Sequence, residues 1–174
     1  MEYREVYTRD ELPTGRIVEK SEPTASGDYF LHALLVLKSD ASPAPGTGEG
    51  LYILQQRSLD KKYFAGLWDV TGGGVRAGET PREGAVREVR EELGLEIDPA
   101  SLTEYDHYRV DWDDGTGLFI SMFACRVPVP DHFNFDPVEV NDVRVVPFSE
   151  YYEKVMTHNG DRFGQILKKI ESEL

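Results

Sequence analysis

The sequence predicts a mixed α/β fold, of the α/β or α+β class, in a single domain of 174 residues. Residues 29–38 form a nearly continuous apolar run, which is typical of a strand buried on both faces. Residues 81–93 carry the capping signals and the apolar stripe of a helix. Further strand-like segments alternate irregularly with few helices, as in mixed α/β and α+β domains.

Residues 1–27 are expected to form an N-terminal hairpin extension. Two short strands, 4–7 and 16–19, flank the turn-rich segment 10–15. Such a hairpin could cover the domain, add to the sheet of a second copy, or do neither. The second alternative makes a homodimer a reasonable expectation.

The core sheet and its main helix are expected between residues 28 and 148. After the strand 29–38, a loop rich in Ala, Pro, Gly and Ser leads to the next strand at 51–57. His32, inside the first strand, is interpreted as a core or pocket-wall residue. The remaining strands are predicted at 101–112, 117–127 and 143–147.

The strand 101–112 carries two polar side chains, His107 and Arg109, on the same face, because residues two apart in a strand point the same way. Both could therefore reach into a cleft. Most aromatic residues of this strand and the next are interpreted as core.

Residues 149–174 are expected to form two C-terminal helices. Ser149 is a suitable N-cap for a short helix that ends near Met156, and Asp161 is a suitable N-cap for the last helix. The last helix has an apolar stripe at Phe163, Ile166, Leu167 and Ile170.

The helix 81–93 is signalled at both ends. Thr80 is a good N-cap, Pro81 fits the first helical position, and Glu83 completes a capping box. Gly94 can adopt the left-handed conformation that ends a helix. Val86, Val89 and Leu93 form an apolar stripe for the core.

Another face of the same helix is acidic. Glu88, Glu91 and Glu92 lie three and four residues apart and therefore share one side. Carboxylates so close repel one another, so they are either fully solvated or gathered around a cation. Oxygen ligands suit Mg²⁺ first, with Mn²⁺ or Ca²⁺ as alternatives.

Three neighbouring features favour a binding site over a solvated acidic face. The glycines 72–74 can expose backbone groups to a ligand. Arg87 can orient the acids or pair with Glu79. Gly84 lies on the acidic face and costs about 1 kcal/mol relative to alanine, which a close approach by a ligand or metal would explain; neutral drift is the alternative.

The segment Gly73–Leu95 resembles the Nudix box, G-x5-E-x7-R-E-U-x-E-E-x-G-U, in which U is a bulky aliphatic residue. Every fixed position is filled at the correct spacing, by Gly73, Glu79, Arg87, Glu88, Val89, Glu91, Glu92, Gly94 and Leu95. The resemblance implies a Nudix fold, an α/β/α sandwich around a mixed β-sheet. It also implies Mg²⁺-dependent or Mn²⁺-dependent hydrolysis of a diphosphate linkage in a nucleoside diphosphate joined to another moiety.

The resemblance implies roles for the residues of the box. Glu91 and Glu92 are expected as direct metal ligands, with the carbonyl of Gly72 as a further ligand. Glu88 is expected to bind metal or to act as, or orient, the base. Glu79 and Arg87 are expected as structural supports.

Many Nudix proteins also carry a loop glutamate about six residues before the middle of the last strand. It adds a metal ligand or activates water, and Glu139 fits this spacing. Val145 stands where a tryptophan is often found, so the chain departs from the family pattern there. An ordinary loop acid is the alternative interpretation of Glu139.

A compact basic group, Arg57, Lys61 and Lys62, precedes the glycines. Arg57 and Lys61 could hold a substrate phosphate, or the group could be solubilising charge.

The R-x3-K-x4-G-x-W pattern ending at Trp68 also resembles isopentenyl-diphosphate isomerases of the same superfamily. Their catalytic cysteine is absent, because Thr71 and three glycines stand there and Cys125 is remote. An isomerase and a non-catalytic nucleotide sensor with a Nudix fold are the alternative functions.

The composition narrows the possible partners. A formal net charge of −13 disfavours nonspecific binding to nucleic acid or to an anionic membrane. A small phosphorylated substrate is compatible, because a bound cation can reverse the local field. No apolar run is long enough to span a membrane, and the start of the chain lacks a signal segment. The single cysteine, Cys125, fits a reducing cytoplasm.

Overall fold

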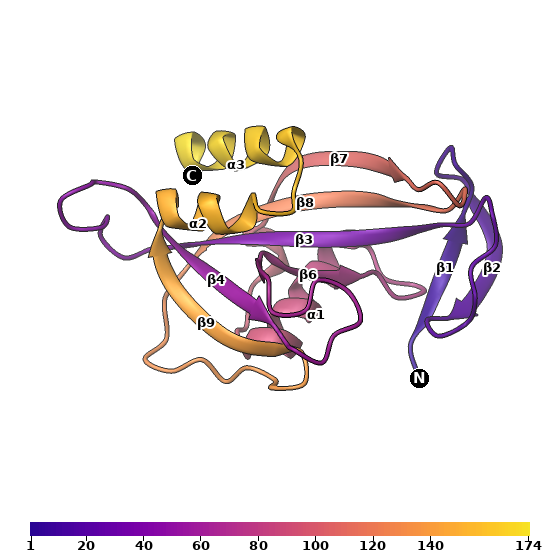
Figure 1. Cartoon of the computed structure of the whole chain (residues 1–174), viewed down its shortest axis with the longest axis horizontal. Helices are drawn as coiled ribbons and strands as arrows, with labels where there is room; N and C mark the ends of the chain where they lie inside the picture. Colours follow the sequence, from indigo (N-terminus) through magenta and orange to yellow (C-terminus); the bar gives the residue numbers. More distant parts are fainter.

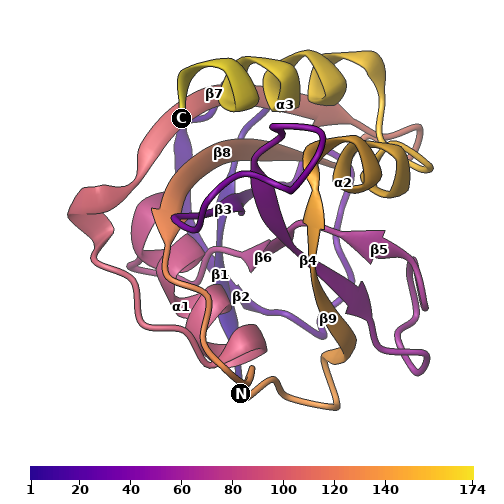
Figure 2. The same ribbon diagram turned by 90° about the vertical axis from the view of Figure 1, so that its left-hand side faces the viewer.

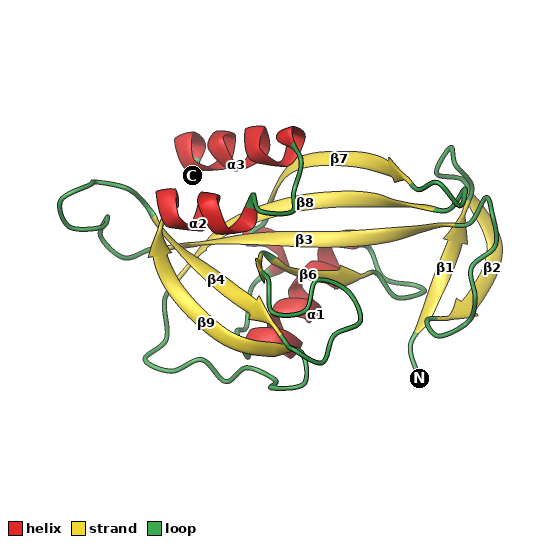
Figure 3. Ribbon diagram, viewed as in Figure 1, coloured by secondary structure: helices red, strands yellow, loops and turns green.

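The computed structural model, which describes residues 1–174, has a mixed nine-stranded sheet with helices on both sides (Figures 1 and 3). Helix α1 (Pro81–Leu93) covers one face, and α2 (Phe148–Val155) and α3 (Asp161–Glu173) cover the other. This α/β/α arrangement confirms the predicted fold class. Neither α1 nor the two C-terminal helices combine the length and apolar character that crossing a lipid bilayer requires.

Strand β3 is the centre of the sheet (Figure 2). It pairs with β8 in parallel from Tyr29 opposite Gly117 to Ser39 opposite Val127, whereas all other strand pairs are antiparallel. The strands are β1 (Tyr3–Tyr7), β2 (Pro13–Glu19), β3 (Tyr29–Ser39), β4 (Leu51–Arg57), β5 (Trp68–Asp69), β6 (Thr71–Gly74), β7 (Thr103–Asp111), β8 (Gly117–Val127) and β9 (Val140–Pro147).

The apolar run of β3 serves two cores. Ala33, Leu35 and Leu37 belong to a cluster with α1, while Val36 packs into a second cluster with α2 and α3. Because successive side chains of a strand point to opposite faces, a continuous apolar run is what a strand between two helical layers requires. The prediction of a strand buried on both faces is confirmed.

The glycines 72–74, expected to expose backbone groups to a ligand, belong to β6, which pairs with β3. A Cβ at Gly72 would overlap the carbonyl oxygen of Ala33, and a Cβ at Gly73 would overlap the carboxylate of Glu88. These glycines therefore let β3, β6 and α1 approach closely. Gly84 is also closely packed, because a Cβ there would lie 3.3 Å from Val75 Cγ2, so the packing of α1 against Val75 is a structural reason for this glycine.

The ends of the helices follow the predicted signals only in α1. Thr80 Oγ1 accepts from Glu83 N at 3.3 Å, the Glu83 side chain accepts from Thr80 N at 2.8 Å, and Gly94 has φ 68°. In α2 the N-cap is Pro147, because Ser149 already lies inside the helix and donates to Glu49. In α3 the N-cap is Gly160, and Asp161 is the first helical residue.

Four predicted strands begin elsewhere. Strand β1 starts at Tyr3 rather than at residue 4, and β2 starts at Pro13 rather than at residue 16. Strand β9 starts at Val140 rather than at residue 143, because Val140 pairs with Arg57 of β4. Strand β7 starts at Thr103 rather than at residue 101, because Pro99–Ser101 forms a 3-10 turn in which Asp98 accepts from Ala100 N.

The N-terminal hairpin joins the sheet through Tyr7 of β1, which pairs with Tyr29 of β3, at the right-hand end of Figure 1. His107 and Arg109 of β7 fasten its turn instead of lining a cleft. His107 Nε2 lies 2.9 Å from Glu11 Oε2, and Arg109 donates to the carbonyl oxygen of Arg9 at 3.2 Å. The predicted shared face is therefore used for packing the hairpin.

Candidate active site

An acidic cavity of about 290 Å³ lies beside α1. Its lining contains no hydrophobic residue and comes from the hairpin, the segment after β6, α1 and the loop before β9. The residues are Glu2, Lys20, Arg76, Glu88, Glu91, Glu92, Asp136 and Glu139. The fold thus brings Glu139 to the three carboxylates of α1, although Glu139 follows them by more than forty positions in the printed sequence.

Glu92 is the most deeply buried of these carboxylates, at 4% exposure. Gln55 Nε2 donates to its Oε2 at 3.0 Å, and Gly72 N donates to the same oxygen at 3.3 Å. Burial, together with repulsion from Glu88, raises the pKa of Glu92 to about 8. The backbone of Gly72 therefore lies beside Glu92, and the family resemblance implies that both residues are metal ligands.

Arg87 connects the other carboxylates. Its guanidinium donates to Glu79 at 2.7 and 3.0 Å, to Glu88 Oε1 at 2.7 Å, to Glu91 Oε2 at 3.1 Å and to the Gly74 carbonyl oxygen at 2.9 Å. Burial raises the pKa of Glu88, against the opposing effect of Arg87. Arg87 thus ties the start of α1 to its acidic face and to β6.

Arg76 is a second arginine that holds Glu91. Its NH1 and NH2 groups each donate to a Glu91 oxygen at 3.1 Å, and its Nε donates to Glu2 at 3.0 Å. This bidentate pair fixes both the distance and the plane of the Glu91 carboxylate.

Of the basic group before β5, only Lys61 reaches the edge of the cavity, where its ammonium forms an ion pair with Glu139. Arg57 does not line the cavity, and its Nε donates to the carbonyl oxygen of Tyr63 at 3.4 Å. Lys62 lies over the ring of Tyr63. The structure therefore separates the members of a group that is compact in the sequence.

Sequence reasoning missed Gln55, Arg76, Glu2, Lys20 and Asp136. Gln55 had a detectable signal, because it is a polar residue that comes directly after four mainly apolar residues of the same buried strand. Arg76 and Asp136 had no distinguishing spacing. Glu2 and Lys20 had no local signal, because only the docking of the hairpin brings them to α1.

The chemistry of these donors fits a divalent cation. All candidate side-chain ligands are carboxylates, which Mg²⁺ and Mn²⁺ prefer. Gln55 Oε1 is buried beside Glu92 without a hydrogen-bond partner, and the absent Cβ of Gly73 leaves space that the Glu88 carboxylate occupies. The carboxylates are not grouped as a ready-made metal site. To bind a metal, Glu88 and Glu91 would have to exchange their arginine contacts for metal contacts.

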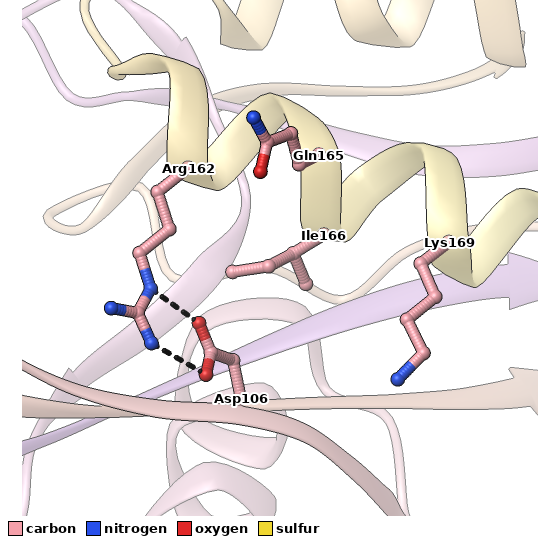
Figure 4. A pocket seen from close by; sticks show the side chains of 5 residues that line it. All are labelled: Asp106, Arg162, Gln165, Ile166 and Lys169. Carbon is pink, nitrogen blue, oxygen red and sulfur yellow. Dashed lines mark hydrogen bonds and ion pairs between the residues drawn. The ribbon is translucent and has the colours of Figure 1, made fainter.

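A larger cavity, of about 550 Å³, lies on the other face of the sheet, between α3 and β7 (Figure 4). Arg162 faces Asp106 there and donates to both of its oxygens, at 2.7 and 2.8 Å. The other lining residues are Gln165, Ile166 and Lys169. This cavity contains no residue of the acidic helix face.

Solved structures share the fold over nearly the whole chain. The Deinococcus radiodurans protein DR0079 superposes with a TM-score of 0.71 at 18% identity, covering 97% of this chain and 98% of that chain. The NUDIX domain of Shewanella oneidensis NrtR, crystallised with ADP ribose, has a TM-score of 0.64 at 14% identity and covers 88% and 93%.

Relatives are also found by sequence. An uncharacterised Nudix hydrolase of Rhodococcus erythropolis is 36% identical over 142 residues, which cover 78% of this chain and 71% of the relative. Nudix hydrolase 8 of Arabidopsis thaliana is 27% identical over 143 residues, which cover 77% of this chain and 38% of the relative. The chain thus spans well under half the length of that plant protein.

A family model described as NUDIX domain matches residues 41–165. This match covers most of the chain and includes all of α1 and the loop that carries Glu139. Together with the complete box and the shared fold, it shows that the chain belongs to the Nudix family.

Proposed function

We propose that this protein hydrolyses a diphosphate linkage in a nucleoside diphosphate joined to another moiety, with Mg²⁺ or Mn²⁺ as cofactor. The observation that carries the proposal is the gathering of Glu88, Glu91, Glu92 and Glu139 around one cavity. Such a set has an evident use in hydrolysis, whereas a pure nucleotide sensor has no need for all four carboxylates. The NrtR domain named above binds ADP ribose, which belongs to the proposed substrate class.

Glu88, Glu91, Glu92 and the Gly72 carbonyl would hold the metal. A bound divalent ion neutralises charge that develops on the phosphate oxygens and positions the linkage. Glu139 is the proposed base, kept in place by Lys61, and Glu88 is the second candidate. Water loses a proton to the base, its oxygen bonds to phosphorus, and the bond from phosphorus to the bridging oxygen breaks. Arg87 and Glu79 support α1, and Arg57 and Lys61 are proposed phosphate contacts.

The experiment that tests this function is a screen of diphosphate compounds with Mg²⁺ and with Mn²⁺, in which mass spectrometry identifies both products. The panel contains nucleoside triphosphates, dinucleoside polyphosphates, sugar nucleotides and NADH. Cleavage between two phosphorus atoms, lost on adding a chelator, is the expected result. A rearranged allylic diphosphate from isopentenyl diphosphate, without cleavage, would favour the isomerase instead. Cys125 argues against that outcome, because it is buried and its burial raises the thiol pKa to about 11.

We also propose a cytoplasmic protein that forms a homodimer and binds neither nucleic acid nor membrane. The unpaired Cys125 and the net charge of −13 support the location and the absence of these partners. Strand β2 supports the dimer, because it pairs only with β1 and leaves one edge free. Light scattering coupled to size-exclusion chromatography measures the oligomeric state directly.

A further inference from the structure

The N-terminal hairpin forms one wall of the acidic cavity. Its open end lies against the segment between β6 and α1, where Ala77 N donates to the carbonyl oxygen of Tyr3 at 2.9 Å and Arg76 Nε donates to Glu2 at 3.0 Å. Glu2 and Lys20 occupy this open end and line the cavity with the carboxylates of α1. Both residues precede the region that the family model matches.

Two cations line the cavity, Lys20 and Arg76, and they differ in the number of hydrogen bonds that they donate to protein groups. Arg76 directs its Nε to Glu2 and both terminal nitrogens to Glu91. The ammonium of Lys20 has three N–H donors and a single protein partner, Glu2 Oε2, at 2.6 Å. Its side chain is 56% exposed, so the remaining donors are accessible to a ligand.

The charge balance of the cavity indicates what that ligand is. Six of the eight lining residues are acidic, which repels a polyphosphate unless cations compensate. A metal held by the carboxylates of α1 would compensate this negative charge on one side of the cavity. Lys20 supplies positive charge on the side formed by the hairpin. A lysine ammonium binds a phosphate group as a point charge.

We propose that Lys20 binds a phosphate oxygen of the nucleoside diphosphate, so that the N-terminal hairpin is part of the substrate site. Glu2 positions Lys20 and does not itself contact the substrate. The proposal rests on the proposed function, because it assumes that the cavity receives a phosphorylated compound.

The test compares Lys20→Met with Lys20→Arg, and with Lys168→Met as a charge-matched control on α3. The probe is adenosine 5′-(α,β-methylene)diphosphate, which is not cleaved, and its binding is measured calorimetrically in the presence of Mg²⁺. Lys20→Met is expected to weaken binding about tenfold or more, as for loss of a charge-assisted hydrogen bond. Lys20→Arg should restore most of the affinity, and Lys168→Met should match the wild type.

Glu2→Gln separates substrate contact from a purely structural role. If Lys20 only fastens the hairpin through Glu2, Glu2→Gln and Lys20→Met will weaken probe binding and lower the melting temperature equally, and the proposal is overturned. It is also overturned if Lys20→Met binds like the wild type, or if the wild type does not bind the probe. Binding of the probe without hydrolysis of any compound in the panel would instead contradict the hydrolase function and leave the Lys20 comparison readable.

Discussion

Gln55 Nε2 donates to Glu92 Oε2 at 3.0 Å, so a residue of β4 sets the orientation of a carboxylate on α1. Gln55 also donates to the Val70 carbonyl oxygen at 3.3 Å, and it is buried at 1% exposure. Residues that orient metal ligands typically contribute a factor of about 10–100 to metal affinity.

Gln55→Leu is therefore expected to weaken Mn²⁺ binding about tenfold or more, because Glu92 loses its orienting donor. Titration of Mn²⁺ followed by electron paramagnetic resonance measures the affinity. Gln165→Leu, on α3 at the far side of the sheet, is the matched control. Equal Mn²⁺ affinity in Gln55→Leu and the wild type would show that Gly72 N alone suffices to orient Glu92.

Glu91→Gln should reduce turnover by orders of magnitude while the protein stays folded. The buried Arg87 keeps its contacts to Glu79 and Glu88 in this variant, so removing the charge of Glu91 leaves no buried group unpaired. Steady-state kinetics gives kcat, and circular dichroism checks the fold. Glu153→Gln on α2 removes one carboxylate elsewhere and serves as control. A normal rate in Glu91→Gln would mean that this residue is not a metal ligand.

Stability without metal should fall as pH rises, and Glu92→Gln should remove part of this dependence. The pKa of Glu92 is raised from 4.5 to about 8 by burial. The unfolded chain therefore loses this proton first, so the stabilisation is complete below about pH 4.5 and is lost as pH rises through about 8.

Urea unfolding of the wild type and of Glu92→Gln in the presence of a chelator measures this effect. Between pH 5 and pH 8 the free energy of unfolding of the wild type should fall by a few kcal/mol more than that of the variant. This magnitude follows because each unit of pKa difference corresponds to about 1.4 kcal/mol. Parallel pH profiles would contradict a buried, protonated Glu92.

Gly73→Ala and Gly72→Ala should separate metal binding from stability. The atoms nearest to the new Cβ at position 73 belong to the end of the Glu88 side chain, so it should displace a carboxylate and weaken Mn²⁺ binding with little change in melting temperature. The Cβ at position 72 meets the backbone of Ala33, so it should destabilise the protein by about 1–3 kcal/mol. Calorimetry gives the stability of both variants, and Mn²⁺ titration gives their metal affinity. If the two variants lose stability and affinity to the same extent, the prediction is contradicted.

Local signals predicted local structure. The capping box at Thr80 and Glu83 and the left-handed Gly94 define both ends of α1, because each signal acts within one turn. The same box predicted the carboxylates that line the cavity. The opposite wall was not predictable in this way, since Glu2 and Lys20 reach α1 through the pairing of β1 with β3 and the contact with Arg76.

The basic group shows what sequence spacing leaves open. Arg57 and Lys61 are close in sequence, but the turn after β4 directs one toward Tyr63 and the other toward Glu139. Backbone direction in a loop depends on tertiary contacts, such as the bond from Ser58 N to the Glu139 carbonyl oxygen at 2.9 Å. Sequence spacing alone carries no information about such contacts.

The parallel pairing of β3 with β8 also constrains how the chain folds. Residues Tyr29 and Gly117 must meet before the central strand has both neighbours, so the contact closes a long loop and forms slowly. During synthesis the apolar β3 emerges well before β8 exists. Until residues up to Val127 have been made, one edge of this strand is open to pairing with other nascent chains. The strand that organises the finished domain is thus also exposed to incorrect pairing while the chain is still being synthesised.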